Sequence, residues 1–456
     1  MKLLNKNVTI AGLGKSGAAC ARFLRTQGAV VTITDRADEA ALADAAEEMR
    51  DIGVSLALAG HPPAVFEEAD LILLSPGIPH TLAPLERARA RGIPVIGEIE
   101  LASRFITEPI VAVTGTNGKT TTTELLGEML RRSGLKVFVG GNIGTPLISY
   151  AAGADKADLL VAEVSSFQLD TIAHFCPKVG LLLNISEDHL DRYPDFAAYG
   201  MSKARLFENQ GADDVAILNG ADPFVRSIGK NISSRRLWFN PSEKDRAGAF
   251  LHDGCLLLRP CEDGQAPVEL DLSSLRLTGT HNLENVAAAA LAALAAGGTP
   301  EGIQAALDRF RGLPHRLEYV DTVDGVRYVD DSKATNVDAV VRALESFDAP
   351  VVLIMGGRGK GSDYTVLNDL IRQHTRRLIV MGETAAEIRE VLGPRCRGGV
   401  REARTMDEAV ALARQSALSG DVVLLSPAGS SFDMYRSYAR RGEDFCRAVR
   451  QLTPPV

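Results

Sequence analysis

The sequence predicts an α/β protein of three domains, each built on a mostly parallel sheet. Short runs of apolar, β-branched residues alternate with helical segments along almost the whole chain, which is typical of parallel sheets. Glycine-rich turns follow several of these runs, at residues 12–17, 115–118 and 356–361. The chain has 456 residues, too many for one hydrophobic core, and this length favours about three domains.

The expected domains are residues 1–108, 109–312 and 313–456. The first and third are expected to be Rossmann-like, because strands and helices alternate regularly through both. The second opens on a glycine-rich loop and is expected to be a P-loop ATPase-like domain. Within it, residues 236–278 lose helical periodicity and predict a small β-rich region, whereas 310–318 looks like the linker to the third domain.

The composition is that of an ordinary globular protein, with 45% hydrophobic and 24% charged residues. A net charge of −8 argues against non-specific binding to nucleic acid or to a membrane surface. The six cysteines form no CxxC pair, which fits a reduced cytosolic protein. The N-terminus lacks an apolar signal-peptide segment, and the most apolar run, 286–296, is too short to span a bilayer. We therefore expect a cytoplasmic protein, and we expect it to be a monomer.

The strongest chemical signal is a strand, loop and helix junction at the start of the second domain. Residues 110–113 predict a buried strand, 115–118 a glycine turn, and Lys119 the start of a helix. N–H groups converge at such a junction, the helix dipole favours anions, and Lys119 adds a positive charge, while Thr120 can offer its hydroxyl to Mg²⁺. Val113 stands where the usual GxxxxGK[ST] pattern has its first glycine. We nevertheless interpret the segment as a site for ATP phosphates rather than as an ordinary glycine turn.

A second glycine turn lies near the N-terminus, where Gly12, Gly14 and Gly17 follow a predicted strand. Together with Asp35 they match the dinucleotide-binding fingerprint, which taken alone indicates NAD and a dehydrogenase. The fingerprint identifies a turn tight enough for a phosphate but does not identify the nucleotide, and a plain packing turn is as common. Another predicted strand runs into residues 75–77, a loop of the kind that lines the ligand crevice of a parallel sheet.

Three further residues of the second domain attract attention by their positions. Glu163 ends a predicted buried strand beside the glycine loop, where P-loop enzymes hold Mg²⁺, although such an acid can also be a helix cap or a surface group. His189 lies in a cluster of possible ligands, 187–192, but a lone histidine is more often structural. Lys203, judged by itself, predicts a solvated lysine on a helix.

In the third domain, three loops follow predicted apolar strands, at residues 330–336, 356–363 and 426–433. The carboxyl ends of parallel strands meet at one edge of a sheet, so these loops are expected to lie together. They combine cations, hydroxyls and glycines, which are suited to binding carboxylates and phosphates. The sequence therefore predicts a ligand site at this edge.

Taken together, these motifs resemble the Mur ligases of peptidoglycan synthesis, and the resemblance covers almost the whole chain in order. The member of the family that adds D-glutamate is the most similar, on the short first domain, the segment Glu-Val-Ser-Ser-Phe-Gln-Leu and the Ser-Pro-Ala ending; the Asp-Asn-Pro-Arg motif of the diaminopimelate-adding members is absent. The segments that carry the resemblance are 115–120, 163–169, 184–192, 281–285, 315–318 and 331–336.

The resemblance implies an ATP-dependent amide ligase of peptidoglycan biosynthesis in the bacterial cytoplasm. ATP would phosphorylate the carboxylate of UDP-N-acetylmuramoyl-L-alanine, and the amine of D-glutamate would then displace phosphate from the acyl phosphate. A carboxylate is a poor electrophile, and phosphorylation gives it a leaving group. Bringing these anions together requires positive charge, which the resemblance assigns to the glycine-loop lysine and to Mg²⁺, expected as two ions.

The resemblance also assigns roles to individual residues. The catalytic set would be Lys119, Glu163, His189 and Lys203, the last as a carbamate that turns the cation into an anion. Metal would be held by Thr120, Glu163, His189 and Lys203. ATP would be bound by Gly115, Thr116, Asn117, Gly118, Lys119, Thr120, Thr121, Asn282, Asn285, Arg316 and Asp331. The UDP-sugar would be bound by Gly14, Ser16, Asp35, Arg36, Ser75, Gly77, Asn142, Ser165 and His189. D-glutamate would be bound by Lys333, Thr335, Lys360, Ser431, Phe432 and Tyr438.

Other functions stay open at this point. An NAD-dependent dehydrogenase would explain the first glycine turn, but it gives no reason for the glycine loop at 115–118 or for the lysine-bearing loops of the third domain. A folylpolyglutamate-type ligase resembles the last two domains only, and another Mur-type ligase would differ in the amino acid added. A regulatory P-loop NTPase would hydrolyse ATP without using either substrate.

Overall fold

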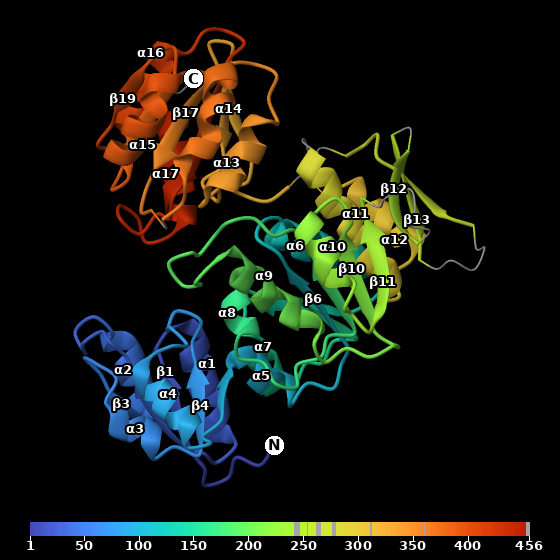
Figure 1. Cartoon of the computed structure of the whole chain (residues 1–456), viewed down its shortest axis with the longest axis vertical. Helices are drawn as coiled ribbons and strands as arrows, with labels where there is room; N and C mark the ends of the chain where they lie inside the picture. Colours follow the sequence, from blue (N-terminus) through green and yellow to red (C-terminus); the bar gives the residue numbers. More distant parts are fainter. Residues whose placement is uncertain are drawn as a thin grey trace. The chain divides into compact units, whose positions relative to one another are not determined.

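The computed structural model describes residues 1–240, 247–252, 254–260, 266–275, 280–310, 312–359 and 361–452. Strands and helices alternate through most of these parts, and the described strands form three sheets in which parallel pairs dominate (Figure 1). The predicted fold class is therefore confirmed. No helix in the described part of the chain is long and apolar enough to cross a membrane.

The first sheet has the strand order β3-β2-β1-β4-β5, and its paired strands are parallel. This is the Rossmann-type order, in which the direction of winding reverses between β1 and β4 and opens a crevice at their carboxyl ends. The strands are β1 (Asn7–Ala11), β2 (Val30–Thr34), β3 (Ser55–Ala57), β4 (Leu71–Leu74) and β5 (Val95–Gly97), and the helices are α1 (Lys15–Thr26), α2 (Ala43–Asp51), α3 (Pro63–Glu67), α4 (Ala83–Ala90) and α5 (Glu98–Ser103).

The second sheet has the order β14-β13-β12-β11-β10-β9-β6-β8-β7 among the described residues. The strands from β7 to β11 are paired in parallel, and β12, β13 and β14 extend the sheet as an antiparallel meander, which is the predicted β-rich region. These strands are β6 (Ile110–Thr114), β7 (Val137–Gly141), β8 (Leu159–Glu163), β9 (Val179–Leu182), β10 (Val215–Asn219), β11 (Arg235–Phe239), β12 (Gly248–His252), β13 (Cys255–Arg259) and β14 (Val268–Asp271).

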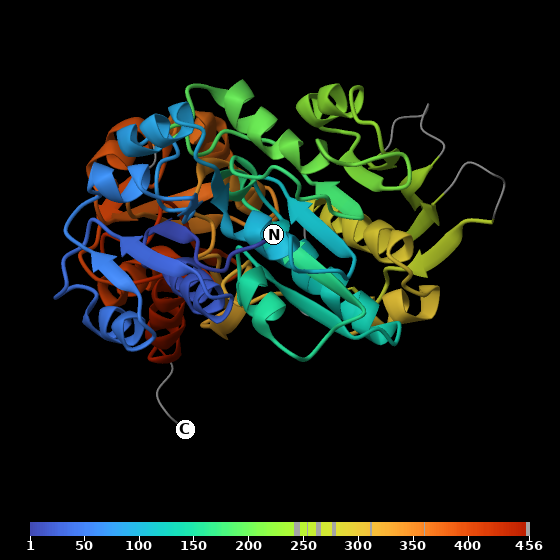
Figure 2. The same cartoon turned by 90° about the horizontal axis from the view of Figure 1, so that it is seen from below.

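Helices cover both faces of this second sheet, because its connections run in both directions from β6. In Figure 2 the yellow helices α11 and α12 and the green helices α9 and α10 lie on opposite sides of the central strands, and α12 packs against α6. The alanine-rich helix α11 is buried, as predicted. The helices are α6 (Lys119–Arg132), α7 (Leu147–Ala152), α8 (Ser166–Leu169), α9 (Phe196–Ala204), α10 (Pro223–Gly229), α11 (Thr280–Ala295) and α12 (Pro300–Leu307), with a 3₁₀ turn η1 (Arg205–Phe207) after α9.

The third sheet has the order β15-β16-β20-β17-β18-β19. Alternate residues of β17 enter two separate cores, Val351 and Leu353 on one face and Val352 and Ile354 on the other, so the strand is apolar throughout. The strands are β15 (Glu318–Val323), β16 (Val326–Asp330), β17 (Val351–Gly356), β18 (Thr375–Met381), β19 (Val400–Glu402) and β20 (Val422–Ala428). The helices are α13 (Val337–Leu344), α14 (Asn368–His374), α15 (Ala385–Leu392), α16 (Met406–Ser416) and α17 (Tyr438–Arg450), with 3₁₀ turns η2 (Tyr364–Leu367) and η3 (Gly393–Arg395).

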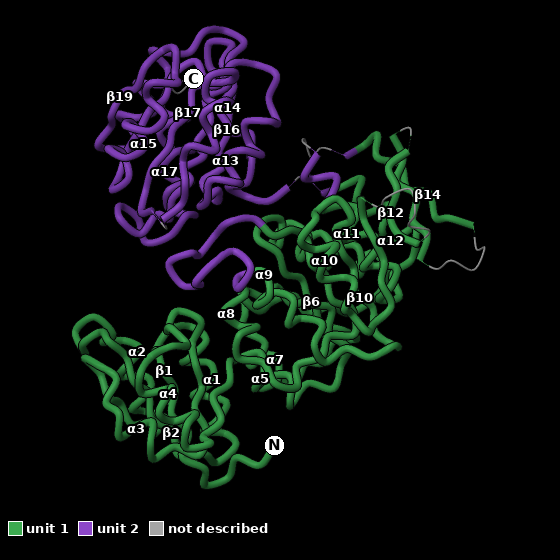
Figure 3. Tube along the Cα trace, in the orientation of Figure 1, with its two compact units in different colours: residues 1–185, 200–274, 285–309 green, residues 186–199, 275–284, 310–456 purple. Residues whose placement is uncertain are grey.

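By their contacts, the described residues divide into two compact units (Figure 3). The first unit contains the first and second sheets, and the second unit contains the third sheet together with two short excursions from the middle of the chain. The first comprises residues 1–185, 200–274 and 285–309, and the second comprises 186–199, 275–284 and 310–456. The domain boundaries at 108/109 and 312/313 stay predictions.

A buried carboxylate on α5 joins the two sheets of the first unit. Glu100 is fully buried, and its Oε2 accepts hydrogen bonds from the N–H groups of Ala173, His174 and Phe175, each at 2.9 Å. Its Oε1 accepts from Arg104 at 2.8 Å. Burial raises the pKa of the Glu100 carboxyl, but these donors together outweigh burial and hold the pKa below its ordinary value.

We expect Glu100→Ala to lower the free energy of unfolding by about 3 kcal/mol, because it leaves buried N–H groups and a guanidinium without their acceptor. Urea unfolding of both proteins measures the change. Since the folded carboxyl has a lowered pKa, its contribution is present above the ordinary glutamate pKa and disappears as the pH falls through the folded pKa, so the two proteins should converge in acid. Glu48→Ala, which removes an exposed partner of Arg22, is the control and should change little. A loss no larger than that of the control would contradict the anchoring role.

Candidate active site

The glycine loop between β6 and α6 has the geometry of an anion-binding turn. Gly118 precedes the first residue of α6 with a φ of +86°, and a Cβ there would lie 2.2 Å from Asn285 Oδ1. Both the left-handed backbone and the close approach of Asn285 therefore require glycine. The predicted ATP residues Gly115 to Thr121 and Asn285 are thereby brought together in the first unit.

The side chain of Lys119 closes over its own loop. Its Nζ donates hydrogen bonds to the carbonyl oxygens of Gly115 at 2.9 Å and Thr116 at 2.7 Å. These hydrogen bonds hold the positive charge at the loop. The hydroxyl of Thr121 is buried and has no hydrogen-bond partner in the described part of the chain. Such a hydroxyl is suited to binding a ligand.

Asn184, which follows β9, clamps the loop from the neighbouring strand. Its Oδ1 accepts from the Asn117 N–H at 2.8 Å, its Nδ2 donates to the Asn117 carbonyl at 3.1 Å, and its own carbonyl accepts from Thr116 N–H at 2.9 Å. Asn184 was not assigned a role from the sequence. Its place directly after a strand, at the edge where the glycine loop is expected, is the signal that could have identified it.

Glu163 lies at the carboxyl end of β8 and is only 2% exposed. Its Oε1 accepts a hydrogen bond from Asn142 Nδ2 at 2.8 Å, so these two predicted site residues are in contact. Its Oε2 is buried and has no hydrogen-bond donor among the described residues. A buried carboxylate oxygen without a donor is costly unless a cation or ligand completes it, so this residue fits a metal ligand. The alternatives of a surface acid or a helix cap are excluded by its burial and position.

Lys203 differs from what its sequence context indicated. It lies near the end of α9 and is 2% exposed, whereas a solvated lysine was expected. The expectation was wrong because neighbouring elements cover this face of the helix. Ser165, another predicted site residue, caps α8, since its hydroxyl accepts from Gln168 N–H at 3.3 Å.

The predicted UDP-sugar residues of the first domain lie at the carboxyl ends of β1, β2 and β4. Asp35 accepts from the N–H groups of Leu13 at 2.8 Å and Ala37 at 2.9 Å, and Ser75 Oγ donates to the carbonyl of Gly12 at 3.1 Å. The loops that follow β1, β2 and β4 are therefore tied to one another. The other predicted residues stand on these same loops or on the first turn of α1, namely Gly14, Ser16, Arg36 and Gly77.

In the second unit, His189 is held in a strained turn, with a φ of +56°. The Asp188 carboxylate accepts from the His189 N–H at 2.9 Å through Oδ1 and from Asn336 Nδ2 at 3.2 Å through Oδ2. This contact joins the excursion 186–199 to the loop after β16. Asp188 and Asn336 were not assigned as site residues from the sequence.

Among the predicted nucleotide residues of the second unit, the charge of Arg316 acts on Asp331 and also on His281, the neighbour of Asn282. Burial raises the pKa of Asp331 to about 7, and Ser426 Oγ, which donates to it at 2.9 Å, and the charge of Arg316 oppose that shift. Burial lowers the pKa of His281 to about 4, and the charges of Arg342 and Arg316 add to that effect. Asn282, beside His281, is buried.

The three loops of the third domain meet at the carboxyl edge of the sheet, as predicted. Ala428 N–H donates to the Ala334 carbonyl at 3.0 Å, and Arg358 and Ser430 exchange backbone hydrogen bonds at 2.8 and 3.0 Å. The buried Arg441 of α17 supports two of them, because it donates to the Ser332 carbonyl at 2.8 Å and the Gly429 carbonyl at 3.1 Å. Arg441 was not predicted from the sequence as a residue of this site.

The predicted D-glutamate residues are brought together in part. The ammonium of Lys333 lies 5.3 Å from the centre of the Tyr438 ring, and Thr335 is half-buried in the same loop as Lys333. Ser431 is buried, whereas Phe432 beside it is 64% exposed. Lys360 lies outside the described residues.

Comparison with known proteins agrees with this geometry along the chain. Residues 6–97 match the Mur ligase MurD-like N-terminal domain, 113–293 the Mur ligase middle domain, and 315–429 the Mur ligase glutamate ligase domain. The chain is 54% identical to a UDP-N-acetylmuramoylalanine–D-glutamate ligase of Desulfosudis oleivorans, over 98% of this chain and 97% of that protein. It is 51% identical to the ligase of the same name from Desulfatibacillum aliphaticivorans, over 99% of this chain and 100% of that protein.

Among solved structures, a pseudomurein peptide ligase type C from Methanothermus fervidus has the same fold. The two superpose with a TM-score of 0.61 at 20% sequence identity, over 98% of this chain and 100% of the other. With domain matches in this order and close relatives over nearly its full length, the chain belongs to the Mur ligase family.

Proposed function

We propose that the chain is an ATP-dependent ligase that joins D-glutamate to UDP-N-acetylmuramoyl-L-alanine, giving ADP and phosphate in peptidoglycan precursor synthesis. The observation that carries this proposal is the identity of 54% over 98% of the chain with a relative of that name. We also propose a monomeric enzyme of the bacterial cytoplasm, where ATP and nucleotide sugars are available.

The proposed chemistry has two steps, and atoms balance in each. A carboxylate oxygen of the L-alanyl group attacks the γ-phosphorus of ATP, so that ADP leaves and an acyl phosphate forms. The amine of D-glutamate then attacks the acyl carbon, loses a proton, and expels phosphate from the tetrahedral intermediate, leaving an amide. The chain's task is to neutralise charge while two anionic substrates approach the anionic triphosphate.

The phosphates of ATP are assigned to the glycine loop, residues 115–121. Support comes from the glycine loop and from the start of α6, where backbone N–H groups favour anions. It also comes from the ammonium of Lys119, which can exchange its carbonyl acceptors for phosphate oxygens. Asn285 packs directly on Gly118 and is assigned to the same nucleotide. In the second unit we assign Asn282, Arg316 and Asp331 to ATP, as the family resemblance implies.

Mg²⁺ is assigned to Thr120, Glu163, His189 and Lys203, with two ions expected. The buried Oε2 of Glu163, which has no hydrogen-bond donor among the described residues, supports this assignment, since a hard cation prefers carboxylate oxygen. When bound, Mg²⁺ would neutralise phosphate charge. A carbamate on the buried Lys203 would convert its side chain to an anionic oxygen ligand. Asn142 orients Glu163 by holding its other oxygen.

The two remaining substrates are assigned to the outer domains. UDP-N-acetylmuramoyl-L-alanine would be bound by Gly14, Ser16, Asp35, Arg36, Ser75, Gly77, Asn142, Ser165 and His189, most of which lie at the carboxyl edge of the first sheet. D-glutamate would be bound by Lys333, Thr335, Lys360, Ser431, Phe432 and Tyr438. The convergence of the three loops at one edge of the third sheet supports that second set.

The reaction is tested directly by incubating the chain with ATP, Mg²⁺, UDP-N-acetylmuramoyl-L-alanine and a panel of amino acids. We expect ADP, phosphate and amide product in equal amounts, with D-glutamate preferred over L-glutamate and the other amino acids. ADP and phosphate are measured enzymatically and the amide by mass spectrometry. Phosphate release that is independent of both substrates would favour a regulatory NTPase, and a response to folates would favour a folylpolyglutamate-type ligase.

Lys119→Ala should reduce kcat by about 10³-fold or more, because the phosphate cradle loses its fixed cation. Steady-state ADP release measures the effect. Lys136→Ala, which removes an exposed lysine outside the loop, is the matched control and should keep the wild-type rate. A Lys119→Ala variant that turns over at a similar rate to this control would rule out the assigned phosphate site.

Glu163→Gln should raise the Mg²⁺ concentration needed for half-maximal rate by about 10-fold or more, because the charge is lost while the side chain keeps its shape. Mn²⁺ binding followed by EPR gives a second readout that does not depend on turnover. Glu128→Gln on the exposed side of α6 serves as the control. Unchanged metal dependence in both measurements would remove Glu163 from the metal site.

A further inference from the structure

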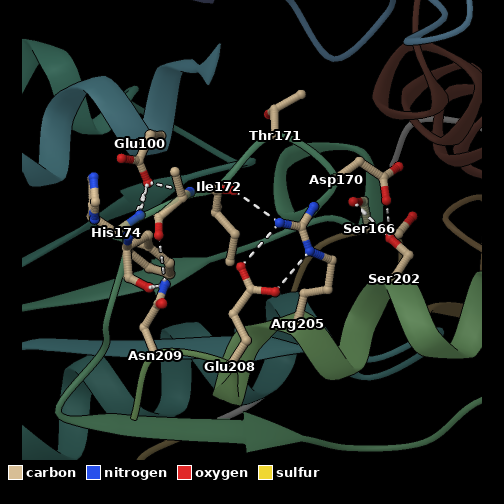
Figure 4. A network of polar contacts seen from close by, with 12 residues as sticks. Glu100, Ser166, Asp170, Thr171, Ile172, His174, Ser202, Arg205, Glu208 and Asn209 are labelled. Carbon is tan, nitrogen blue, oxygen red and sulfur yellow. Dashed lines mark hydrogen bonds and ion pairs between the residues drawn. The ribbon is translucent and has the colours of Figure 1, made fainter. Parts of the chain in front are cut away.

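Lys203 lies between two residues, Ser202 and Arg205, whose side chains are hydrogen-bonded to another segment of the chain. Before it, Ser202 Oγ lies 2.6 Å from Asp170 Oδ1 and 3.0 Å from the Ser166 carbonyl oxygen. After it, Arg205 Nη2 donates to the Ile172 carbonyl at 2.8 Å. Figure 4 shows both connections, which run from α9 and η1 to one segment, residues 166–172.

This partner segment continues directly from the strand that ends in Glu163. Residues 166–169 form α8, whose first turn is fixed by reciprocal hydrogen bonds between Ser165 and Gln168, and Asp170 is its C-terminal cap. Asp170 is therefore connected to Glu163 through one short capped turn. The contact between Asp170 and Ser202 sets the spacing between the end of β8 and the helix that carries Lys203.

The segment cannot easily shift, because it is held further along as well. The carboxylate of Glu100 accepts from the N–H groups of residues 173–175. Asn209 Nδ2 donates to the carbonyls of Ala173 at 3.3 Å and Phe175 at 3.1 Å (Figure 4). Asp170 thus acts from a fixed support rather than from a free loop.

The second oxygen of Asp170 faces the first domain. Asp170 Oδ2 lies 3.8 Å from His80 Nδ1, and His80 belongs to the loop after β4 that contains Ser75 and Gly77. The Asp170 side chain is only 13% exposed. One half-buried carboxylate therefore lies between the loop assigned to the UDP-sugar and the helix that carries Lys203.

We propose that Asp170 is a positioning residue for Lys203, acting through Ser202. A buried hydroxyl bonded to a carboxylate is a strong, directional link, so it restrains α9 more firmly than apolar packing would. Misplacing a catalytic group by about 1 Å can cost up to about 10²-fold in rate. The inference rests on the role proposed above for Lys203.

The test compares Asp170→Ala, Asp170→Asn and Ser202→Ala, with the Asp170→Ala/Ser202→Ala double variant. Asp170→Ala and Ser202→Ala should each lower kcat by about 10-fold, with KM for ATP and for D-glutamate within about twofold of wild type. Asp170→Asn keeps an acceptor for Ser202 and should retain most of the wild-type kcat.

The kcat of the double variant should be within about twofold of that of the worse single variant, because both substitutions remove the same Asp170–Ser202 hydrogen bond. Ser103→Ala, which removes a hydroxyl bonded to the Glu100 carbonyl on α5, is the matched control.

A wild-type kcat in Ser202→Ala and Asp170→Ala would overturn the inference, even if their melting temperatures fell, because a purely structural role affects stability alone. Multiplying effects in the double variant would overturn it as well. Ser202→Ala removes a single hydroxyl and keeps the test valid if Asp170→Ala does not fold. Lys203→Ala is measured in parallel: if it is inactive while Asp170→Ala is normal, only this inference fails, and if it is fully active, the role of Lys203 fails too. Absence of amide product from the wild-type chain would instead reject the proposed function.

Discussion

The candidate site depends on the parallel pairing of β6 with β8 on one side and β9 on the other. Because parallel strands end at the same edge, this pairing places the glycine loop, Glu163 and Asn184 side by side, although they are distant in the sequence. An antiparallel neighbour would have directed one of these groups to the opposite edge. The hydrogen bonds of Asn184 to the glycine loop and of Asn142 to Glu163 then refine an arrangement that the sheet has already imposed.

Buried charge is the second recurring feature, and backbone groups stabilise two of these side chains, Glu100 and Arg441. Glu100 takes up consecutive N–H groups of one segment, and Arg441 donates to carbonyls of two loops. Such side chains hold irregular backbone that has no strand partner, which parallel sheets need at the edge where ligands bind. Glu163 is different, because one of its oxygens has no donor among the described residues. Both oxygens of Glu100 have donors, whereas one oxygen of Glu163 has none in the part of the chain that the structure describes.

Much of the fold could be predicted from the sequence, because its signals are local. Apolar β-branched runs and glycine turns identified the strand at 110–113, observed as Ile110–Thr114, and the position of Glu163 at a strand end. The burial of Lys203 and the roles of Asp170 and Arg441 could not be predicted in this way. Asp170 meets Ser202 across 32 residues, and Arg441 meets Ser332 across 109, so these contacts depend on how separate elements pack. Most assigned ligand-binding residues remain predictions that rest on resemblance.

The resting position of Lys119 has a consequence for which nucleotides the loop selects. Its ammonium already donates hydrogen bonds to two carbonyl oxygens. The binding free energy that a ligand gains from Lys119 is therefore only the difference between its own acceptors and these neutral ones. A nucleoside has only neutral acceptors, so its affinity is not raised by Lys119. A polyphosphate chain has anionic oxygens, which accept stronger hydrogen bonds from the ammonium. Selectivity for the charged end of the nucleotide thus follows from an exchange of acceptors at the Lys119 ammonium.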